Sequence, residues 1–325
     1  MRSRPTPGFQ LRRIAHIWLA ASALLLLAPA VYAQTTKLVV PIPAGGAGDI
    51  LARVLAEQIG RTHGEVMVVE NRPGGSTVVG TEAVARAAPD GRTLLIAGTG
   101  LVINPHLRAT SYDPLKSFEP VCHLVSLPTV IVVKGSSPYA TLTDLINAAR
   151  GKPGQLTLAS IGPASTAHIA FEMLKRASGM NMTFVPFPGT APAVTALLGD
   201  HVTSFLGNYA EVAEHLKSGT MRPLASASPA RIDALPEVPT LDELGYGIGL
   251  GDVWYGLVAP AKTPKETISR LAGWFGAALH TPEVKAKLVA NGIHPALTCG
   301  AQYGAYLRQQ YDEYGRAIRE ANIRP

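Results

Sequence analysis

The sequence predicts an α/β protein of two lobes, each with a central sheet flanked by helices, and a cleft between the lobes. Segments with strand and helix patterns alternate along the chain in two series of similar size. Glycine-containing loops stand where strands are followed by helices. The chain has 325 residues, which is long enough for two such lobes.

The N-terminal segment, residues 1–33, is expected to be a secretory signal peptide. Two arginines precede an apolar run over residues 14–30, and the segment ends in Val-Tyr-Ala, a typical cleavage pattern. An uncleaved membrane anchor is the alternative, but the apolar run is short for a full span. Cleavage after Ala33 would leave a periplasmic chain that starts at Gln34.

The charge pattern disfavours a nucleic-acid partner. The whole chain has a net charge of +6, but four arginines and no acidic residue lie in the leader, so the mature chain would have about +2. The remaining charges are interspersed, with no basic run next to aromatic residues. No later segment is long and apolar enough to span a membrane, so a soluble exported protein is expected.

The first series starts with a strand at residues 37–40, followed by a helix. The helix is indicated by apolar residues at the i, i+3, i+4 spacing, namely Ile50, Leu51, Val54, Leu55 and Ile59. The loop between them, residues 41–49, therefore lies over a helix N-terminus, where unpaired N–H groups and the helix dipole favour an anion. A structural interpretation stays open, in which the glycines permit a tight turn and Asp49 caps the helix.

The remaining elements follow the same alternation, which is typical of parallel sheets flanked by helices. The first series continues with strands at residues 66–70 and 93–97 and a helix at residues 78–88. The second series has strands at residues 129–133, 156–160, 182–187, 201–207 and 222–227, and helices at residues 141–150, 167–178, 191–199 and 211–219. Thr141 and Asp144 form a capping-box pattern at the start of one of these helices.

The end of the chain has a strand at residues 254–260 and helices that start near residues 264, 282 and 301. This region does not look like an independent third domain. We therefore expect the chain to cross from one lobe to the other and return. Lobe 1 would comprise residues 34–121 and 226–325, and lobe 2 residues 122–225.

Motifs for catalysis, metals and cofactors are lacking. The sequence contains no G-x-S-x-G elbow, no H-E-x-x-H motif and no carboxylate cluster, so no catalytic or metal-ligating residue is predicted. The loop at residues 41–49 lacks the third glycine of a dinucleotide site and the lysine of a P-loop, so no cofactor is expected. A hydrolase based on Ser165 and His168 is a weaker alternative, because no orienting carboxylate accompanies them.

Eight motifs in one order resemble the Bug family, the periplasmic substrate-binding proteins of tripartite tricarboxylate transporters. They cover essentially the whole mature chain and are VVPIPAGGAGDILAR, VVENRPGG, AVARAAPDGRTLL, INPHL, YDPLKSFEPV, FVPFPGTAPAVTALLG, PEVPTLDELGY and WYGLVAPAKTP. The resemblance implies a type II periplasmic-binding fold that closes on a small organic anion carrying a carboxylate. It also implies a monomer whose partners are the membrane components of such a transporter. A binding protein that serves a membrane sensor kinase is the alternative.

In the family, two loops hold the ligand carboxylate like pincers, which gives candidate ligand-binding residues here. The first loop supplies Ile42, Pro43, Ala44, Gly45, Gly46 and Asp49. The second loop supplies Ser160, Gly162, Ala164, Ser165, Thr166 and His168, and Phe187 and Asn208 are further candidates. Structural interpretations remain for several of them: the serines and Asn208 as turn or cap residues, and His168 as a packed residue.

Departures from the family pattern bear on the ligand. Ile42 stands where the family usually has an aromatic residue, Phe187 and Pro188 replace a tyrosine and a lysine, and Thr203 and Gly207 replace aspartates. The replacements after Ile42 remove polar or charged groups, so a monocarboxylate or dicarboxylate with an apolar body is expected in place of a tricarboxylate.

The chain has two cysteines, Cys122 and Cys299. In an oxidising compartment they either form a disulfide or remain as buried thiols. Two cysteines are too few for a disulfide-rich scaffold or a cysteine zinc site.

Overall fold

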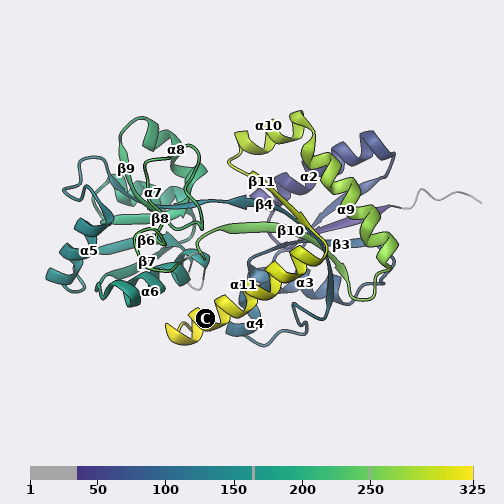
Figure 1. Cartoon of the computed structure of the whole chain (residues 1–325), viewed down its shortest axis with the longest axis horizontal. Coiled ribbons are helices and arrows are strands. Elements are labelled where there is room, and N and C mark those ends of the chain that lie inside the picture. Colours follow the sequence, from purple (N-terminus) through teal and green to yellow (C-terminus); the bar gives the residue numbers. More distant parts are fainter. Residues whose placement is uncertain (1–34, 163–164, 249, 325) are drawn as a thin grey trace, which may run out of the picture. The chain divides into compact units, whose positions relative to one another are not determined.

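Two β-sheets organise the described part of the chain. The computed structural model describes residues 35–162, 165–248 and 250–324, so the leader and its cleavage site lie outside the described residues. The six-stranded sheet has the order β11-β4-β10-β3-β1-β2 (Figure 1). Its strands are β1 (Thr36–Val40), β2 (Met67–Asn71), β3 (Thr93–Gly98), β4 (Phe118–Leu127), β10 (Val253–Pro260) and β11 (His294–Cys299).

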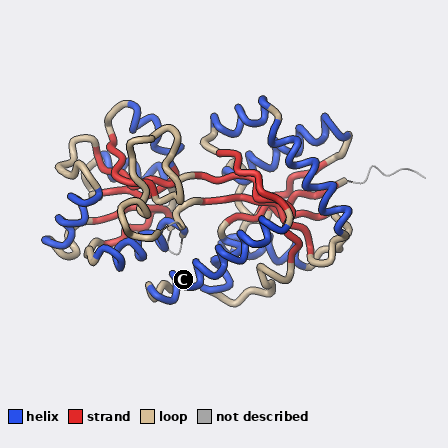
Figure 2. The backbone as a smooth tube through the Cα atoms, in the orientation of Figure 1, coloured by secondary structure: helices blue, strands red, loops and turns tan. Residues whose placement is uncertain are grey.

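The second sheet has five strands in the order β7-β6-β8-β5-β9. They are β5 (Thr129–Lys134), β6 (Thr157–Ile161), β7 (Thr183–Phe187), β8 (Ser204–Asn208) and β9 (Met221–Ser226). The chain passes from the first sheet to the second between β4 and β5, which are separated by Pro128 alone (Figure 2). It returns through the segment between β9 and β10.

Both sheets are mixed, whereas the sequence predicts parallel sheets. Strand β1 pairs parallel with β2 and β3, and β6 pairs parallel with β7 and β8. Strand β10 instead runs antiparallel to β3 and β4, β11 to β4, and β5 to β8 and β9. Apart from β11, the antiparallel strands lie where the chain leaves one sheet for the other and where it returns, between β4 and β5 and between β9 and β10, and not in the strand-helix-strand units. The parallel pairing that the alternation predicts is thus confirmed for β1, β2 and β3 and for β6, β7 and β8, and the antiparallel strands are additional to it.

Side chains alternate along the central strands and enter cores on both faces of each sheet. In β1, Leu38 and Val40 join one buried cluster and Val39 joins another, as the two-residue period of a strand requires. In β5, Ile131 and Val130 divide between two further clusters in the same way. Because both faces are covered, these strands appear in the sequence as continuous apolar runs.

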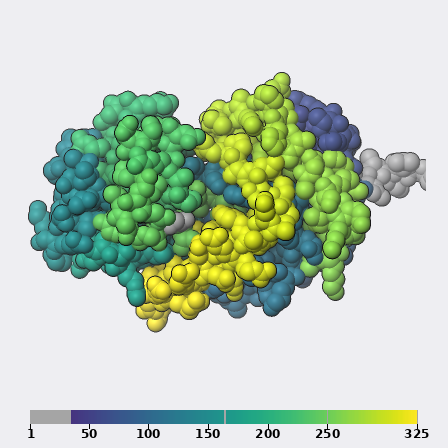
Figure 3. Space-filling view, in the orientation of Figure 1, coloured from purple at the N-terminus to yellow at the C-terminus, as the bar shows by residue number. Residues whose placement is uncertain are grey.

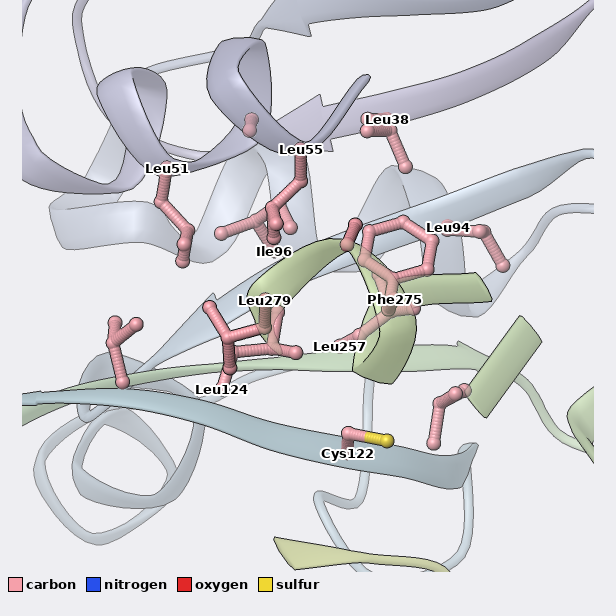
Figure 4. Close-up of a cluster of buried hydrophobic side chains, with 14 of the residues drawn as sticks. Leu38, Leu51, Leu55, Leu94, Ile96, Cys122, Leu124, Leu257, Phe275 and Leu279 are labelled. Atoms are coloured by element: carbon pink, nitrogen blue, oxygen red, sulfur yellow. The ribbon is translucent and has the colours of Figure 1, made fainter. Parts of the chain in front are cut away.

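Helices cover both faces of the six-stranded sheet. One face packs against α2 (Ala47–His63), α9 (Lys265–His280) and α10 (Pro282–Ala290), and Figure 4 shows Leu51, Leu55, Phe275 and Leu279 of this cluster facing Leu38 and Ile96. The other face packs against α3 (Val78–Ala85), α4 (Gly100–Leu107) and the long C-terminal helix α11 (Ala301–Glu320), which lies at the surface in Figure 3. A short 3-10 turn, η1 (Gly75–Thr77), precedes α3.

The five-stranded sheet is covered in the same manner. One face packs against α5 (Leu142–Gly151) and α6 (Thr166–Ser178), and the other against α7 (Thr190–Leu198) and α8 (Tyr209–Lys217). The capping box predicted at Thr141 and Asp144 is present at the start of α5. The described helices include none that is long and apolar enough to cross a membrane.

Cys122 and Cys299 form a disulfide between β4 and β11. The two residues are directly opposite each other in the antiparallel pair. Sequence analysis predicts neither of these strands, and it does not predict helix α4. Strand β11 lies at the edge of the sheet and has no fully buried residue. Such strands give a weak hydrophobic pattern.

Candidate functional site

The starts of five helices meet around a cavity of about 260 Å³. Helices α3 and α4 come from the six-stranded sheet, and α6, α7 and α8 from the five-stranded sheet. The lining residues that belong to these helix starts or directly precede them are Ser76, Thr77, Thr99, Gly100, Ser165, Thr166, Ala167, Thr190, Asn208 and Glu211. The rest of the lining comes from Ile103, Asn104, Thr129, Ser160, Ile161, Gly207 and Val253.

The cavity suits an anion because of its backbone. Helices α3, α4, α7 and α8 have no side-chain hydrogen bond at their N-caps. Backbone carbonyls already accept the N–H groups of Val78 and Val79 at α3 and of Tyr209 at α8. Among the described residues, the first N–H groups of α4 and α7 are therefore the ones best placed for a ligand. Each helix also contributes the positive end of its dipole. Among the described lining residues there is no lysine, arginine or histidine. A bound carboxylate would therefore be held by N–H and hydroxyl donors and not by a cationic side chain.

The loop that precedes α3 has an unusual backbone. Gly74, Gly75, Ser76 and Thr77 all have positive φ, with values of 132, 54, 53 and 84°. This conformation is rare for a β-branched residue such as Thr77, and strain of this kind concentrates at functional sites. The sequence shows the glycine pair but gives no sign that the next two residues share its conformation, so sequence analysis missed this part of the site.

Asn104 of α4 fixes this loop against the cavity. Its side-chain amide donates to the carbonyl oxygen of Ser76 at 2.7 Å and to the hydroxyl of Thr77 at 3.2 Å. It also donates to the carbonyl oxygen of Gly100 at 2.9 Å, and the residue is only 3% exposed. One buried amide thus joins the starts of α3 and α4.

The second predicted loop contributes directly to the cavity through Ser160, Ser165 and Thr166. Ser165 Oγ accepts a hydrogen bond from the backbone N–H of His168 at 3.2 Å and so caps α6. Ser160 Oγ donates to the carbonyl oxygen of Leu206 at 2.6 Å. Thr166 Oγ1 donates to Thr99 Oγ1 at 3.3 Å and thereby connects the helix starts of the two sheets.

The first predicted loop does not line this cavity. Asp49, which is 3% exposed, accepts hydrogen bonds from Gly45 N at 2.9 Å, Arg53 Nε at 3.0 Å and Asn71 Nδ2 at 2.9 Å. Burial raises the pKa of Asp49, but these hydrogen bonds and the Arg53 charge outweigh burial and hold the pKa below its usual value. The interpretation of Asp49 as the N-cap of α2 is therefore wrong: Gly46 is the N-cap, without a side-chain hydrogen bond, and Asp49 is a first-turn acid that compensates the helix dipole.

Ile42 and Gly46 of the first loop lie against each other. A Cβ built on Gly46 would be 2.9 Å from the Ile42 side chain, which is partly buried against the core. Pro43, Ala44 and Gly45 also stand outside the lining of the cavity. Tyr255 of β10 connects this loop to the site, because its ring packs against both Gly48 and Gly98, the residue before Thr99.

The other predicted residues divide between the cavity and its surroundings. Asn208 lines the cavity, whereas Gly162 and Phe187 do not; they are joined by a hydrogen bond from Gly162 N to Phe187 O of 3.1 Å. Phe187 is partly buried against the core below α7. Ala164 lies outside the described residues.

His168 faces away from the cavity lining. Its ring stacks on Phe184 with centroids 4.2 Å apart, and Nε2 lies 3.9 Å from the Glu172 carboxylate. Burial lowers the pKa of His168, while Glu172 raises it and Lys175 lowers it. The hydrogen bond between Ser165 and His168 involves the backbone N–H of the histidine and not its imidazole ring.

A larger cavity of about 770 Å³ lies between α6, α11 and the segment before β10, and no predicted site residue lines it. Its lining mixes charges of both signs, including Arg176, Arg316, Asp242 and Glu313. Burial raises the pKa of Asp252 in this lining to about 6. Of these two cavities, the smaller one is the candidate site, because the starts of α3, α4, α7 and α8, which have no side-chain cap, converge at it.

Comparisons with known proteins place this chain in a family. Residues 51–323 match the family model described as tripartite tricarboxylate transporter family receptor. Protein BugT of Bordetella pertussis is 31% identical over 90% of each chain. A Rhodopseudomonas palustris protein solved with adipate is 29% identical with a TM-score of 0.76, over 92% of this chain and 99% of that one.

MatC of Rhodopseudomonas palustris, solved with bound malate, is 26% identical with a TM-score of 0.70, over 87% of this chain and 98% of that one. The two-sheet fold is shared with these solved structures. Together with the family match, the fold and the helix starts that line the cavity lead to one conclusion: this chain belongs to the receptors of the tripartite tricarboxylate transporter family, a family of periplasmic solute-binding proteins.

Proposed function

We propose that this receptor captures a small organic anion through its carboxylate in the 260 Å³ cavity and delivers it to the membrane components of a tripartite tricarboxylate transporter. The observation that most strongly supports a carboxylate is the convergence of five helix starts, four of them without a side-chain cap. Two similar proteins were solved with adipate and malate, which are both carboxylates.

The two sheets would act as two lobes that close over the ligand. The lobe boundaries expected from the sequence, residues 34–121 with 226–325 and residues 122–225, fall near the two places where the chain changes sheet. The hydrogen bond from Thr166 to Thr99 joins loops of the two sheets beside the cavity. A ligand that bridges the same helix starts would favour the closed arrangement by differential binding.

In the arrangement of this structure, the first loop would support the site indirectly, through its contact with Tyr255. In a more closed arrangement, it would contact the ligand itself. Only if the lobes close further would its six candidates, Ile42 to Gly46 and Asp49, bind the ligand directly, and the same holds for Gly162, Ala164, His168 and Phe187. The cavity-lining candidates Ser160, Ser165, Thr166 and Asn208 are proposed to act in both arrangements.

Ligand binding by the purified mature protein is the direct test. Ligand carried over from expression is first removed by partial unfolding and refolding, and carboxylates are then screened by thermal shift and calorimetry. A ligand at 100 times its dissociation constant adds about 2.7 kcal/mol to the free energy of unfolding, which raises the melting temperature by several degrees. The matched control is the primary amide of each acid, which has the same shape without the charge.

Acids should bind at least about tenfold more tightly than their amides, because hydrogen bonds to a charged group contribute more than neutral ones. Equal affinity for acid and amide would contradict the carboxylate site, even if the protein bound both.

Export and the absence of turnover are further parts of the proposal. Mass spectrometry of the periplasmic protein should give an N-terminus at Gln34, and light scattering should give a monomer. Candidate carboxylates, esters and amides should be recovered unchanged after incubation with the protein. Conversion that is lost in Ser165→Ala would contradict the receptor function in favour of hydrolysis.

A further inference from the structure

One acidic side chain, Glu211, lines the cavity that would bind an anion. It is the only acidic or basic residue among the described lining residues. It stands at the third position of α8 and is exposed. An acid in the first turn of a helix commonly stabilises the helix dipole, so its position in the sequence alone indicates nothing more.

The orientation of Glu211 differs from that of a simple first-turn acid. Its Oε2 accepts a hydrogen bond of 2.7 Å from the hydroxyl of Thr190, the first residue of α7. Thr190 lines the same cavity, so two helices together hold this carboxylate at the cavity wall. The side chain of Asn208, the N-cap residue of α8, makes no capping hydrogen bond.

The charge of Glu211 also reaches a residue of the other sheet. Tyr255 belongs to the six-stranded sheet, and its pKa is raised to about 12, first by burial and then by the negative charge of Glu211. No cation among the described lining residues compensates this charge. The cavity therefore combines backbone donors for one anionic group with a fixed negative charge on the side of α7 and α8.

We propose that Glu211 makes the receptor select ligands that carry a protonated amine in addition to the carboxylate, in preference to dicarboxylates. This proposal rests on the proposed carboxylate-binding function. The helix starts would hold the ligand carboxylate, and Glu211 would accept hydrogen bonds from the ammonium group at the other end. A second ligand carboxylate at that position would face Glu211 without a counter-ion, and both groups would lose solvation.

Matched ligands test the contributions of the two ends of the ligand separately. Adipate, 6-aminohexanoate and hexanoate share a six-carbon chain and differ only in the group opposite the carboxylate. Succinate, 4-aminobutanoate and butanoate form the same set at four carbons. Calorimetry at neutral pH on the refolded mature protein should show the amino acid of the better-fitting set binding at least about tenfold more tightly than its dicarboxylate.

The variant Glu211→Gln keeps the shape and removes the charge. It should reduce the preference for the amino acid to within about threefold, mainly by weakening its binding. Glu214→Gln is the control, because Glu214 is exposed on the same helix, pairs with Lys217 and does not line the cavity. This control should retain the preference of the parent protein.

The outcomes distinguish this proposal from the proposed function. Binding of hexanoate or adipate with no gain for the amino acid would overturn the role of Glu211 and leave the carboxylate site intact. An unchanged preference in Glu211→Gln would also overturn it. If no carboxylate of either set bound and their amides did, the carboxylate site and this proposal would both be wrong.

Discussion

The loops that precede α2 and α6 have similar sequences but different roles in this structure. Each follows a strand, contains glycine and ends at a helix start. At α2, the Asp49 carboxylate accepts hydrogen bonds from its own loop, Arg53 and Asn71. At α6, the cap is the neutral hydroxyl of Ser165, and the helix start lines the cavity.

We propose that this difference decides which of the two helix starts binds an anion. The dipole and the unpaired N–H groups exist at both helices. The Asp49 carboxylate in the first turn compensates the dipole at α2, although no side chain caps that helix, whereas α6 is capped by a neutral hydroxyl and has no acidic residue in its first turn. The predictions below test whether the α2 loop is mainly structural and the α6 loop mainly functional.

The largest expected effect is the loss of stability in the variant Asp49→Asn. The variant removes a buried charge that accepts three hydrogen bonds, and we expect the free energy of unfolding to fall by about 2 kcal/mol at neutral pH. Urea unfolding measures this loss. Ligand affinity should stay within about threefold of the parent value, because Asp49 does not line the cavity.

The pH dependence gives a second criterion for Asp49. Its pKa is lowered in the folded protein, so its stabilisation is present above the ordinary aspartate pKa and is lost as pH falls through the folded value. The stabilities of the parent and the variant should therefore converge below about pH 4. A variant that lost ligand affinity tenfold with unchanged stability would show that the α2 loop acts on the ligand directly.

The two loops can next be compared by affinity. Thr166→Val removes the hydroxyl that joins the two sheets beside the cavity, and binding of the best carboxylate should weaken about tenfold. Gly46→Val adds a branched side chain to the α2 loop, where the nearest obstacle is the flexible end of Ile42. Its effect on affinity should be no more than about threefold.

The same pair of variants tests the pincer arrangement implied by the family resemblance. If the α2 loop contacts the ligand in a closed state, Gly46→Val should abolish the thermal shift while the fold stays intact. Calorimetry on both variants decides between the two expectations, and circular dichroism checks that each variant is folded.

The loops also show how far the sequence could predict this molecule. Apolar periodicity located the α2 and α6 helices and the strands before them, because burial imposes the period. The capping box at Thr141 and Asp144 was predicted because its three-residue spacing is local. Strand β4 was missed because it contains Pro120 and His123.

The unpredicted parts of the site depend on contacts between distant segments. Thr77 adopts positive φ against the preference of its residue type, and its hydroxyl accepts a hydrogen bond from Asn104 in another helix. Glu211 has the sequence pattern of a first-turn surface acid, and only its bond to Thr190 places it at the cavity. No local pattern contains this information.

A smaller effect is expected from the cap of α6. Ser165→Ala removes the hydroxyl that accepts from His168 N, and loss of such a cap costs about 1 kcal/mol of stability. Urea unfolding measures this cost. Because the same residue lines the cavity, affinity should also fall severalfold, in contrast to Asp49→Asn. Ser165→Thr is the conservative control and should retain the cap. Unchanged ligand affinity in Ser165→Ala would show that Ser165 has only a structural role.

The smallest effect is expected for His168, which belongs to the α6 helix but does not line the cavity. Burial lowers its pKa, so the neutral ring is favoured in the folded protein. Its contribution to stability is therefore present above the ordinary histidine pKa and is lost as pH falls towards the lowered value. His168→Phe keeps the stacking on Phe184 and cannot become protonated. Urea unfolding at pH values of about 7.5 and 5.5 should show less acid destabilisation in the variant than in the parent, on either side of the ordinary pKa. Ligand affinity at the higher pH should be unchanged. A large loss of affinity would instead show that the imidazole contacts the ligand, and that the ligand-binding part of this segment continues beyond Thr166.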